Sequence, residues 1–412
     1  MTAIATLDPT LRDFVNAKSQ QSINLCFVCS KCTAGCPVAG VADLRPAQFL
    51  RLVQFGLTDA LLNNPALWRC LGCDLCGARC PNDVHIGAML AAARELTWDQ
   101  ARRASFSDPA IVQGMERLGR LCGNIAATHN VTGDAAENRT LWTQNLERTP
   151  EGLLNRGDAE VVYFTGCVGA LFPQSYRIPQ SFTAILAFAE SDFTVLGGEE
   201  WCCGYPLVAA GQHERARELM RHNVDQIKAM GSRTLVATCP SCYHMWCREY
   251  PALLGAPLPF EVKHSTQFVA GLLKDSVVKL NAFEGALTYH DPCDLCRKSD
   301  VFDAPREVLS NIPHARFIEM TNYGMNAMCC GGGGNLETFD PTLPPKVASE
   351  RLNDAVGTGA NVLVSACQQC ERTLMGTARK HDGARKVRLK VMDVVELVAQ
   401  QLPWQVPGKR DA

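Results

Sequence analysis

The sequence lacks the features that would direct it to nucleic acid, to a lipid bilayer or to secretion. Its 40 Lys and Arg residues nearly balance its 42 Asp and Glu residues, so it has no excess of positive charge for binding nucleic acid. It has no predominantly apolar run of about 18 residues, which a transmembrane helix requires. Residues 1–24 contain charges and no apolar stretch of the secretory type. We therefore expect a soluble, cytoplasmic chain without a membrane span, with peripheral docking through a partner left open.

Nucleotide-binding patterns are also missing. No Gly-x-Gly-x-x-Gly follows a predicted strand, and no P-loop pattern occurs. The chain is therefore not expected to hold nicotinamide, flavin or ATP by itself, and electrons would have to arrive from another protein.

Cysteine, by contrast, is abundant, with 21 residues in a chain of 412. Cytosolic proteins keep their thiols reduced, so disulfides explain this number poorly. Metal or cluster binding is the better interpretation, and the spacing of the cysteines indicates which kind.

Two runs of the form Cys-x2-Cys-x2-Cys-x3-Cys-Pro occur near the N-terminus. They are Cys26, Cys29, Cys32 and Cys36 before Pro37, and Cys70, Cys73, Cys76 and Cys80 before Pro81. This is the spacing of bacterial two-cluster ferredoxins, in which the fourth cysteine of each run reaches the other cluster. Two [4Fe–4S] cubanes are therefore predicted, one held by Cys26, Cys29, Cys32 and Cys80 and the other by Cys70, Cys73, Cys76 and Cys36. Two zinc sites are the alternative, but zinc usually takes two separated Cys-x2-Cys pairs.

The rest of the chain contains an internal repeat of five cysteines. The first set is Cys167, Cys202, Cys203, Cys239 and Cys242, and the second is Cys293, Cys329, Cys330, Cys367 and Cys370. Corresponding cysteines lie 126 residues apart (167 to 293), 127 apart (202 to 329) and 128 apart (239 to 367). Such constant spacing predicts two similar domains.

Strand and helix patterns alternate within each repeat. Strands are expected at 160–167, 193–196, 234–238, 285–293 and 362–365, and helices at 46–56, 86–96, 177–190, 212–230, 243–254 and 371–380. Alternation of this kind predicts a parallel sheet, and ligands of such sheets lie beyond the carboxyl ends of the strands. The cysteines after predicted strands, Cys167, Cys239, Cys293 and Cys367, should therefore converge.

The predicted fold is thus α+β and multidomain. A mainly helical ferredoxin-like domain with two cubanes is expected over 11–100, followed by a partly helical linker over 101–159 in which Asp108-Pro109 and Gly123-Asn124 act as breakers. Two similar α/β domains with parallel sheets are expected over 160–280 and 281–402.

Five cysteines per repeat are one more than a cubane or a zinc ion needs. From the residues alone, four ligands with a spare thiol and a cluster with five sulfur ligands both stay open. The pattern Cys…Cys-Cys-Gly…Cys-x2-Cys, present twice, resembles the cysteine-rich CCG domain. The order of a ferredoxin-like unit before two CCG domains is similar to the D-type chain of heterodisulfide reductase, which fuses the ferredoxin-like C-type chain with the B-type chain that carries the CCG domains.

This resemblance implies that each CCG domain holds a non-cubane [4Fe–4S] cluster through its five cysteines, and all ten positions carry over as ligands. It also implies that the two clusters face each other and divide a disulfide between them, with Cys203 and Cys330 as catalytic candidates. His290, close to Cys293, is a further candidate for donating a hydrogen bond to cluster sulfur or a proton to a departing thiolate, although a packing role is equally open.

Several other residues carry weaker signals. Cys122, Cys247 and Cys296 are left over and are expected to be small buried hydrophobes, with Cys296 a competing ligand because it forms Cys-x2-Cys with Cys293. The run Gly331–Gly334 would let backbone approach a cluster or substrate closely, or would be a flexible turn. His222 and His244 are expected to be structural or solvent-facing.

Two functions compete. In the first, the chain is the iron–sulfur subunit of a heterodisulfide-reductase-like complex, passing electrons through the cubanes to the paired clusters for disulfide chemistry. In the second, it is a non-catalytic electron-transfer subunit, similar to those of glycolate, lactate or glycerol-3-phosphate dehydrogenases or of aromatic-ring-reducing complexes. Two complete sets of five favour the first, as does Asp43-Leu-Arg-Pro46, which replaces the Pro-Arg-Gly-Arg of the glycolate type. Either function implies a hetero-oligomer with a flavin- or cytochrome-containing partner, and a structural zinc or scaffold protein is a third class.

Overall fold

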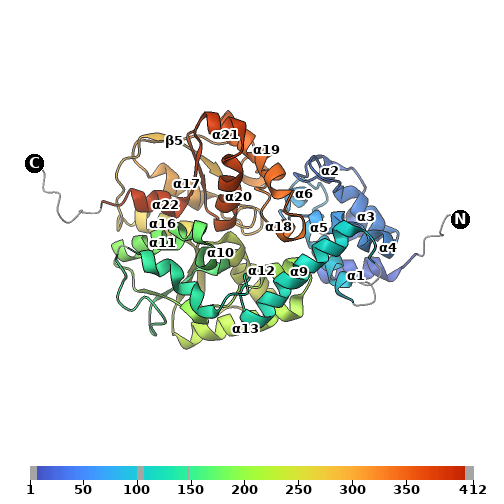
Figure 1. The fold of residues 1–412 in the computed structure, drawn as a ribbon, viewed down its shortest axis with the longest axis horizontal. Helices are drawn as coiled ribbons and strands as arrows, with labels where there is room; N and C mark the ends of the chain where they lie inside the picture. Colours follow the sequence, from blue (N-terminus) through green and yellow to red (C-terminus); the bar gives the residue numbers. More distant parts are fainter. Residues whose placement is uncertain (1–6, 100–105, 147, 404–412) are drawn as a thin grey trace, which may run out of the picture.

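The computed structural model describes residues 7–99, 106–146 and 148–403. Residues 1–6 lie outside these ranges, and they begin the segment that is predicted to lack a secretory signal. Residues 100–105 also lie outside, and they contain the predicted boundary between the first domain and the linker. Figure 1 shows the N-terminal helices on one side of the molecule and two α/β units, one green and one orange to red, on the other.

The N-terminal unit is helical, as predicted. Its helices are α1 (Thr10–Ser19), α2 (Lys31–Ala34), α3 (Pro46–Gln54), α4 (Thr58–Leu62), α5 (Ala66–Arg69), α6 (Leu75–Ala78) and α7 (Ile86–Glu95). The short helices α2 and α6 begin inside the two cysteine runs, each after a residue in the left-handed conformation, Ser30 (φ 62°) and Asp74 (φ 56°). The two runs therefore fold in the same way, as their common spacing predicts.

The predicted linker contains a long helix, α9 (Pro109–Thr128), and a 3-10 segment, η3 (Ala136–Asn145). Asp108-Pro109 does not break structure here but starts α9: the Asp108 carboxylate accepts a hydrogen bond from the amide of Ala110 at 2.7 Å, and proline occupies the first helical turn. The prediction that Gly123-Asn124 interrupts the helix is also wrong. Apolar side chains of α9 from Ile111 to Ile125 form a buried stripe, and their burial outweighs the cost of one glycine, about 1 kcal/mol.

The first α/β unit has a parallel sheet of four strands in the order β2-β1-β3-β4. The strands are β1 (Val161–Phe164), β2 (Phe193–Val195), β3 (Thr234–Ala237) and β4 (Glu261–His264), and the helices include α10 (Gly166–Leu171), α11 (Arg177–Phe188), α12 (Tyr205–Ala209), α13 (His213–Ala229) and α16 (Ser265–Lys274). The predicted helix at 243–254 is divided into α14 (Pro240–His244), a π-helical turn (Met245–Glu249) and α15 (Tyr250–Leu254).

The second α/β unit repeats this topology with the order β6-β5-β7-β8. Its strands are β5 (Gly285–His290), β6 (Ala315–Phe317), β7 (Val362–Ser365) and β8 (Lys390–Asp393), and its helices are α17 (Asp303–Ser310), α18 (Leu336–Phe339), α19 (Pro344–Gly357), α20 (Gln368–Ala378), α21 (Asp382–Lys386) and α22 (Val394–Gln400). The prediction of two similar units with parallel sheets is confirmed. Edge strands β4, β6 and β8 escaped prediction because they are short and partly polar.

The three units are packed together rather than strung along a linker. Helix α11 packs on α22, and α16 packs on α17, joining the two sheets. A separate apolar cluster joins the N-terminal unit, through Val38, Leu71 and Leu75, to Met320 and Leu336 of the second α/β unit. None of the helices in the described part of the chain combines the length and apolar composition needed to cross a bilayer. The domain boundaries 11–100, 101–159, 160–280 and 281–402 stay predictions.

Candidate iron–sulfur centres

The cysteines of the N-terminal unit gather in two crossed groups of four. Cys26, Cys29, Cys32 and Cys80 line one small cavity together, so the last cysteine of the second run lies with the first three of the first run. Conversely, burial together with the thiols of Cys73 and Cys70 raises the pKa of Cys36 to about 12. Burial, with Cys70, Cys73 and Cys36 among its neighbours, also raises the pKa of Cys76. This is the arrangement that crossed ligation requires.

The first set of five, which we call the first pentad, forms a continuous chain of neighbouring thiols. The order of hydrogen-bonding neighbours is Cys167, Cys202, Cys203, Cys242 and Cys239. Hydrogen bonds from Cys202 and then from Cys242 lower the pKa of Cys203 to about 6, so this thiol ionises readily. Cys167 and Cys239 follow the adjacent central strands β1 and β3, which explains why residues so distant in sequence meet.

The second pentad repeats this order with Cys293, Cys329, Cys330, Cys370 and Cys367. The Sγ atoms of Cys330 and Cys370 lie 3.2 Å apart. Hydrogen bonds from Cys329 and from Cys370 hold the pKa of Cys330 well below its usual value. Cys203 and Cys330, the predicted catalytic candidates, are therefore the corresponding low-pKa thiols at the middle of each chain.

A glycine follows each Cys-Cys pair for a conformational reason. Gly204 and Gly331 have φ values of 87° and 90°, which L-amino acids rarely adopt. In this conformation their amides donate hydrogen bonds at 3.5 Å to the first sulfur of each pair, Cys202 Sγ and Cys329 Sγ. The glycine thus turns the chain so that a backbone donor faces a thiol, which stabilises the thiolate that iron binds.

The two pentads lie side by side, and each Cys-x2-Cys loop contacts the other domain. Gln368 accepts a hydrogen bond from the Gly169 amide at 2.9 Å and donates one to Thr238 Oγ1 at 2.7 Å. From the first domain, Ser241 donates to the Asp294 carboxylate at 2.6 Å. The thiols of Cys239 and Cys367 are electrostatic neighbours across this interface.

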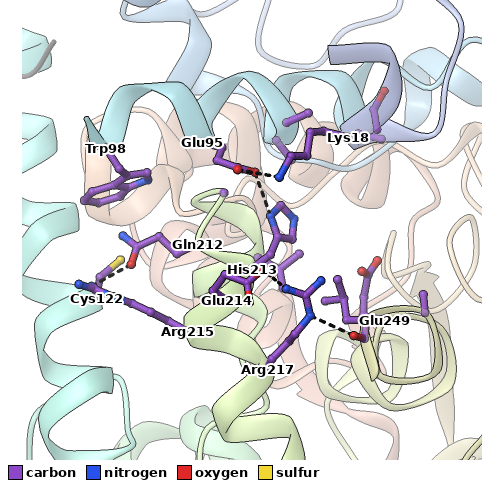
Figure 2. Close-up of a pocket in the computed structure, with 18 of the residues that line it drawn as sticks. Lys18, Glu95, Trp98, Cys122, Gln212, His213, Glu214, Arg215, Arg217 and Glu249 are labelled. Atoms are coloured by element: carbon purple, nitrogen blue, oxygen red, sulfur yellow. Dashed lines mark hydrogen bonds and ion pairs between the residues drawn. The ribbon is translucent and has the colours of Figure 1, made fainter. Parts of the chain in front are cut away.

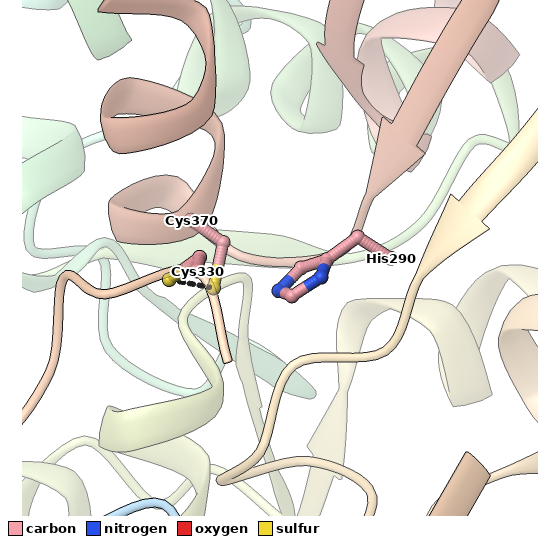
Figure 3. Close-up of side chains that lie close together, drawn as sticks. All are labelled: His290, Cys330 and Cys370. Carbon is pink, nitrogen blue, oxygen red and sulfur yellow. Dashed lines mark hydrogen bonds between the residues drawn. The ribbon is translucent and has the colours of Figure 1, made fainter. Parts of the chain in front are cut away.

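His290 belongs to the second pentad, as Figure 3 shows. A ring nitrogen of His290 and the sulfurs of Cys330 and Cys370 all lie within 4.8 Å of one another. Arg351 donates from Nε to His290 Nδ1 at 3.0 Å, so the ring proton is on Nε2, available to the Cys330 sulfur. Burial lowers the pKa of His290, which keeps the ring a neutral donor. The corresponding position in the first repeat, 126 residues earlier, is Phe164, so the two pentads are not equivalent.

Beside the first pentad lies a positively charged side chain from the predicted linker. Arg139 of η3 is buried, donates to Cys167 Sγ at 3.6 Å from two of its nitrogens, and forms an ion pair with buried Glu200 at 3.0 Å. Glu200 in turn accepts hydrogen bonds from the amides of Thr165 and Gly166 at 2.7 and 2.9 Å. No motif marked Arg139, because its role arises from the docking of the linker.

The residues present fit iron–sulfur clusters. No disulfide joins any of the 21 cysteines, all of which lie in the described part of the chain. Buried polar atoms without a hydrogen-bond partner occur beside both pentads, namely Arg139 Nε, His290 Nε2 and Arg297 Nη2. Unsatisfied buried donors are costly, and donors directed at a group of anionic sulfurs would be satisfied by a bound cluster.

Of the three remaining cysteines, Cys296 is an electrostatic neighbour of Cys293 in the second pentad. Cys122 is buried in α9, Cys247 interacts with Tyr243, and Cys296 donates to the Gly324 carbonyl at 3.8 Å. His244 is buried against Ser299 Oγ at 3.1 Å, and His222 stacks on Trp201 with ring centroids 3.6 Å apart. These contacts agree with the structural roles expected for both histidines.

The glycine run after Cys330 approaches a cluster loop, although one in another unit. A Cβ atom on Gly334, whose φ is 62°, would lie 2.5 Å from the Cys70 carbonyl oxygen. The run therefore allows close packing of the second α/β unit on the second cysteine run. The approach of these glycines to a cluster or substrate stays a prediction.

A cavity of about 1060 Å³ lies between α1, α7, α9, α13 and α15, and Figure 2 shows the side chains that line it. Its charged side chains are mostly paired with each other: Glu95 contacts Lys18 at 2.8 Å and His213 at 3.6 Å, and Arg217 pairs with Glu214. Among the cysteines only Cys122 lines this cavity, so it is separate from the cluster sites.

Models of known protein families match the N-terminal unit and both α/β units. Residues 25–85 match the 4Fe-4S dicluster domain, and residues 161–246 and 287–375 each match the cysteine-rich CCG domain. The fold and the cysteine groups therefore define an iron–sulfur protein with one dicluster unit and two CCG units.

Similarity to individual proteins shows which family within this class the chain belongs to. The chain is 31% identical to the D-type chain of dihydromethanophenazine:CoB–CoM heterodisulfide reductase from Methanosarcina mazei, over 94% of this chain and 96% of that protein. It is 23% identical to the B-type chain of a CoM/CoB fumarate reductase from Methanothermobacter marburgensis, over 90% of this chain and 71% of that protein. A hypothetical protein from Helicobacter pylori shares the fold, with a TM-score of 0.58 and 11% identity over 97% of this chain and 74% of that one. The chain belongs to the family of the D-type heterodisulfide reductase chains, which are iron–sulfur oxidoreductase subunits.

Proposed function

We propose that this chain is the iron–sulfur subunit of a heterodisulfide-reductase-like complex. Its N-terminal unit would carry electrons through two [4Fe–4S] cubanes, and its two pentads would each hold a non-cubane [4Fe–4S] cluster at which a disulfide is reduced to two thiols. The redox partner would be a flavin- or cytochrome-containing subunit, through which the complex could also dock at a membrane.

The observation that carries this proposal is the pair of complete five-thiol chains held side by side. A cluster used only to pass electrons needs four ligands, whereas each chain here has a fifth thiol, and Gln368 and Asp294 hold the two chains against each other. Two adjacent iron centres can each take one sulfur of a disulfide. His290, with its Nε2 proton beside Cys330, is placed to hydrogen-bond a sulfur that gains charge.

One observation favours a second function, in which the chain only conducts electrons to a flavoprotein that carries out the substrate chemistry. Nine of the ten pentad cysteines are buried, and only Cys293 is partly exposed. Buried clusters suit electron transfer, because no substrate has to reach them. A relative named as part of a fumarate reductase is compatible with this function.

Anaerobically purified protein tests both functions. Four clusters predict about 16 irons per chain, and reduced protein offered a disulfide should form thiol without a partner. Cys203→Ala should abolish thiol formation and alter the non-cubane signal in electron paramagnetic resonance while sparing the cubane signals. A full iron content without thiol formation from any disulfide tried would favour the conduit, and zinc in place of iron would exclude both functions.

A further inference from the structure

The N-terminal unit touches the second pentad directly through its second cysteine run. Cys73 and Cys329 are hydrogen-bonding neighbours, although one belongs to the predicted second cubane site and the other to the second pentad. Two predicted cluster sites in different units therefore share a thiol–thiol contact.

Arg297 lies at this junction and binds the backbone on both sides of it. Its guanidinium donates from Nε to the Cys73 carbonyl at 2.8 Å and from Nη1 to the Ala327 carbonyl at 2.7 Å. Ala327 precedes the Cys329-Cys330 pair by two residues. One side chain therefore holds the loop of the second cubane site and the loop of the second pentad at a fixed separation.

The guanidinium also brings unneutralised charge to the junction. Arg297 is only 7% exposed, its Nη2 has no hydrogen-bond partner, and it forms no ion pair with a carboxylate among the described residues. Its electrostatic neighbours are the thiols Cys73, Cys293, Cys296 and Cys329. A buried donor left without a partner is costly, so this nitrogen is suited to face sulfur that becomes anionic when iron binds.

In the described part of the chain, the first pentad lacks an arginine at the corresponding position. The position that corresponds to Arg297, 126 residues earlier, is Leu171, an apolar residue at the end of α10. The cation beside the first pentad is Arg139, which comes from η3 and pairs with Glu200. The contact between the N-terminal unit and Arg297 is therefore specific to the second repeat.

We propose that Arg297 is a positioning residue for one-electron transfer between the second cubane site and the second pentad, so that electrons from the N-terminal unit reach the second pentad before the first. This inference rests on the function proposed above. In the step, the site of Cys36, Cys70, Cys73 and Cys76 loses one electron and the second pentad gains it, without any change of bond or proton. The guanidinium stabilises negative charge on both sides, and cluster potentials follow nearby charge and hydrogen bonds.

The test uses the full-length anaerobic chain in a Cys203→Ala background, so that the remaining non-cubane signal belongs to the second pentad. After rapid reduction of the cubanes, freeze-quench electron paramagnetic resonance follows the second pentad, and a redox titration gives each midpoint potential. We expect Arg297→Gln to slow the transfer at least about tenfold and to make the potential of the second cubane more negative. Arg297→Lys should restore most of the potential but not the rate, because it lacks the planar fork.

The control is Arg316→Gln, which removes an exposed cation from edge strand β6 of the same domain and should match the parent in rate and potentials. Wild-type rate and potential in Arg297→Gln would overturn the inference while leaving the proposed function intact. If Arg297→Gln does not fold, an unchanged rate in Arg297→Lys would overturn it equally. The order of electron transfer has its own test. In Cys330→Ala, unimpaired reduction of the first pentad would show that electrons do not have to reach the second pentad first.

Absence of non-cubane clusters from the wild-type chain would instead contradict the proposed function.

Discussion

Individual thiols within one cluster site differ in how readily they ionise. In the second cubane site, burial raises the pKa of Cys36 to about 12, whereas a hydrogen bond with Cys329 lowers that of Cys73 to about 6. Backbone amides also face sulfur in both cubane sites, since Val28 and Gly72 donate at 3.4 Å to Cys26 Sγ and Cys70 Sγ. A thiol with a high pKa becomes a thiolate only when a metal replaces its proton, so the second cubane site and the two pentads contain both thiols that ionise readily and thiols that iron itself must deprotonate.

The crossed grouping of the N-terminal cysteines predicts an effect far from the mutated run. Cys36→Ser should remove the second cubane, although Cys36 belongs to the first run, and should lower the iron content from about 16 to about 12 per chain. Iron analysis and electron paramagnetic resonance would measure this. Cys247→Ser, at a half-buried cysteine outside the groups, is the matched control and should keep all the iron. Loss of the first cubane in place of the second would contradict crossed ligation.

Strands and helices act mainly by bringing chain ends together. The central strands β1 and β3, and β5 and β7, each end just before a cysteine, so the carboxyl edge of each sheet collects thiols. Helix α9 instead joins two units of the molecule. It packs on α18 of the second α/β unit, and at Gly114 the two helices approach so closely that the Phe339 ring lies 2.2 Å from a Cβ position.

Two glycines of α9 should therefore respond oppositely to the same substitution. Gly114→Ala should destabilise the protein by about 1–3 kcal/mol, because the methyl group overlaps the buried Phe339 ring. Gly123→Ala, on the same helix, meets no atom within 4 Å and should stabilise it by up to about 1 kcal/mol, the helix propensity of alanine over glycine. Denaturant unfolding of both variants measures the difference. Equal effects would show that α9 and α18 do not pack in solution as described.

The molecule as a whole depends on contacts that join all three units. Arg94 of α7 is the clearest case: its buried guanidinium donates to the carbonyls of Leu67 and Cys70 at 3.0 and 2.9 Å, and to Ala209 of the first α/β unit at 2.8 Å. It also lies 3.4 Å from the Gly334 carbonyl of the second α/β unit. Because the same guanidinium holds three units, their relative positions are fixed at the second cubane site.

Arg94→Gln should consequently cost about 3 kcal/mol of unfolding free energy, since it leaves several buried carbonyls without a donor. We also expect the second cubane to become more labile, as its Cys70 loop loses an anchor. Chemical denaturation and the rate of iron release to a chelator would measure these effects. Arg120→Gln, an exposed cation on α9, serves as the control, and equal stability of the two variants would show that Arg94 does not hold the units together.

The sequence by itself determined the cysteine groups and the two parallel sheets. The predicted ligands of one cubane come largely from a single local turn, and the strand-then-cysteine pattern is repeated at nearly constant spacing. Both are therefore visible in the order of residues. Only the tertiary structure showed that Cys73 meets Cys329, that Arg139 reaches Cys167, and that Gln368 and Arg297 join different units. These contacts connect residues far apart in the chain that share no periodic pattern, so they exist only once the units have packed.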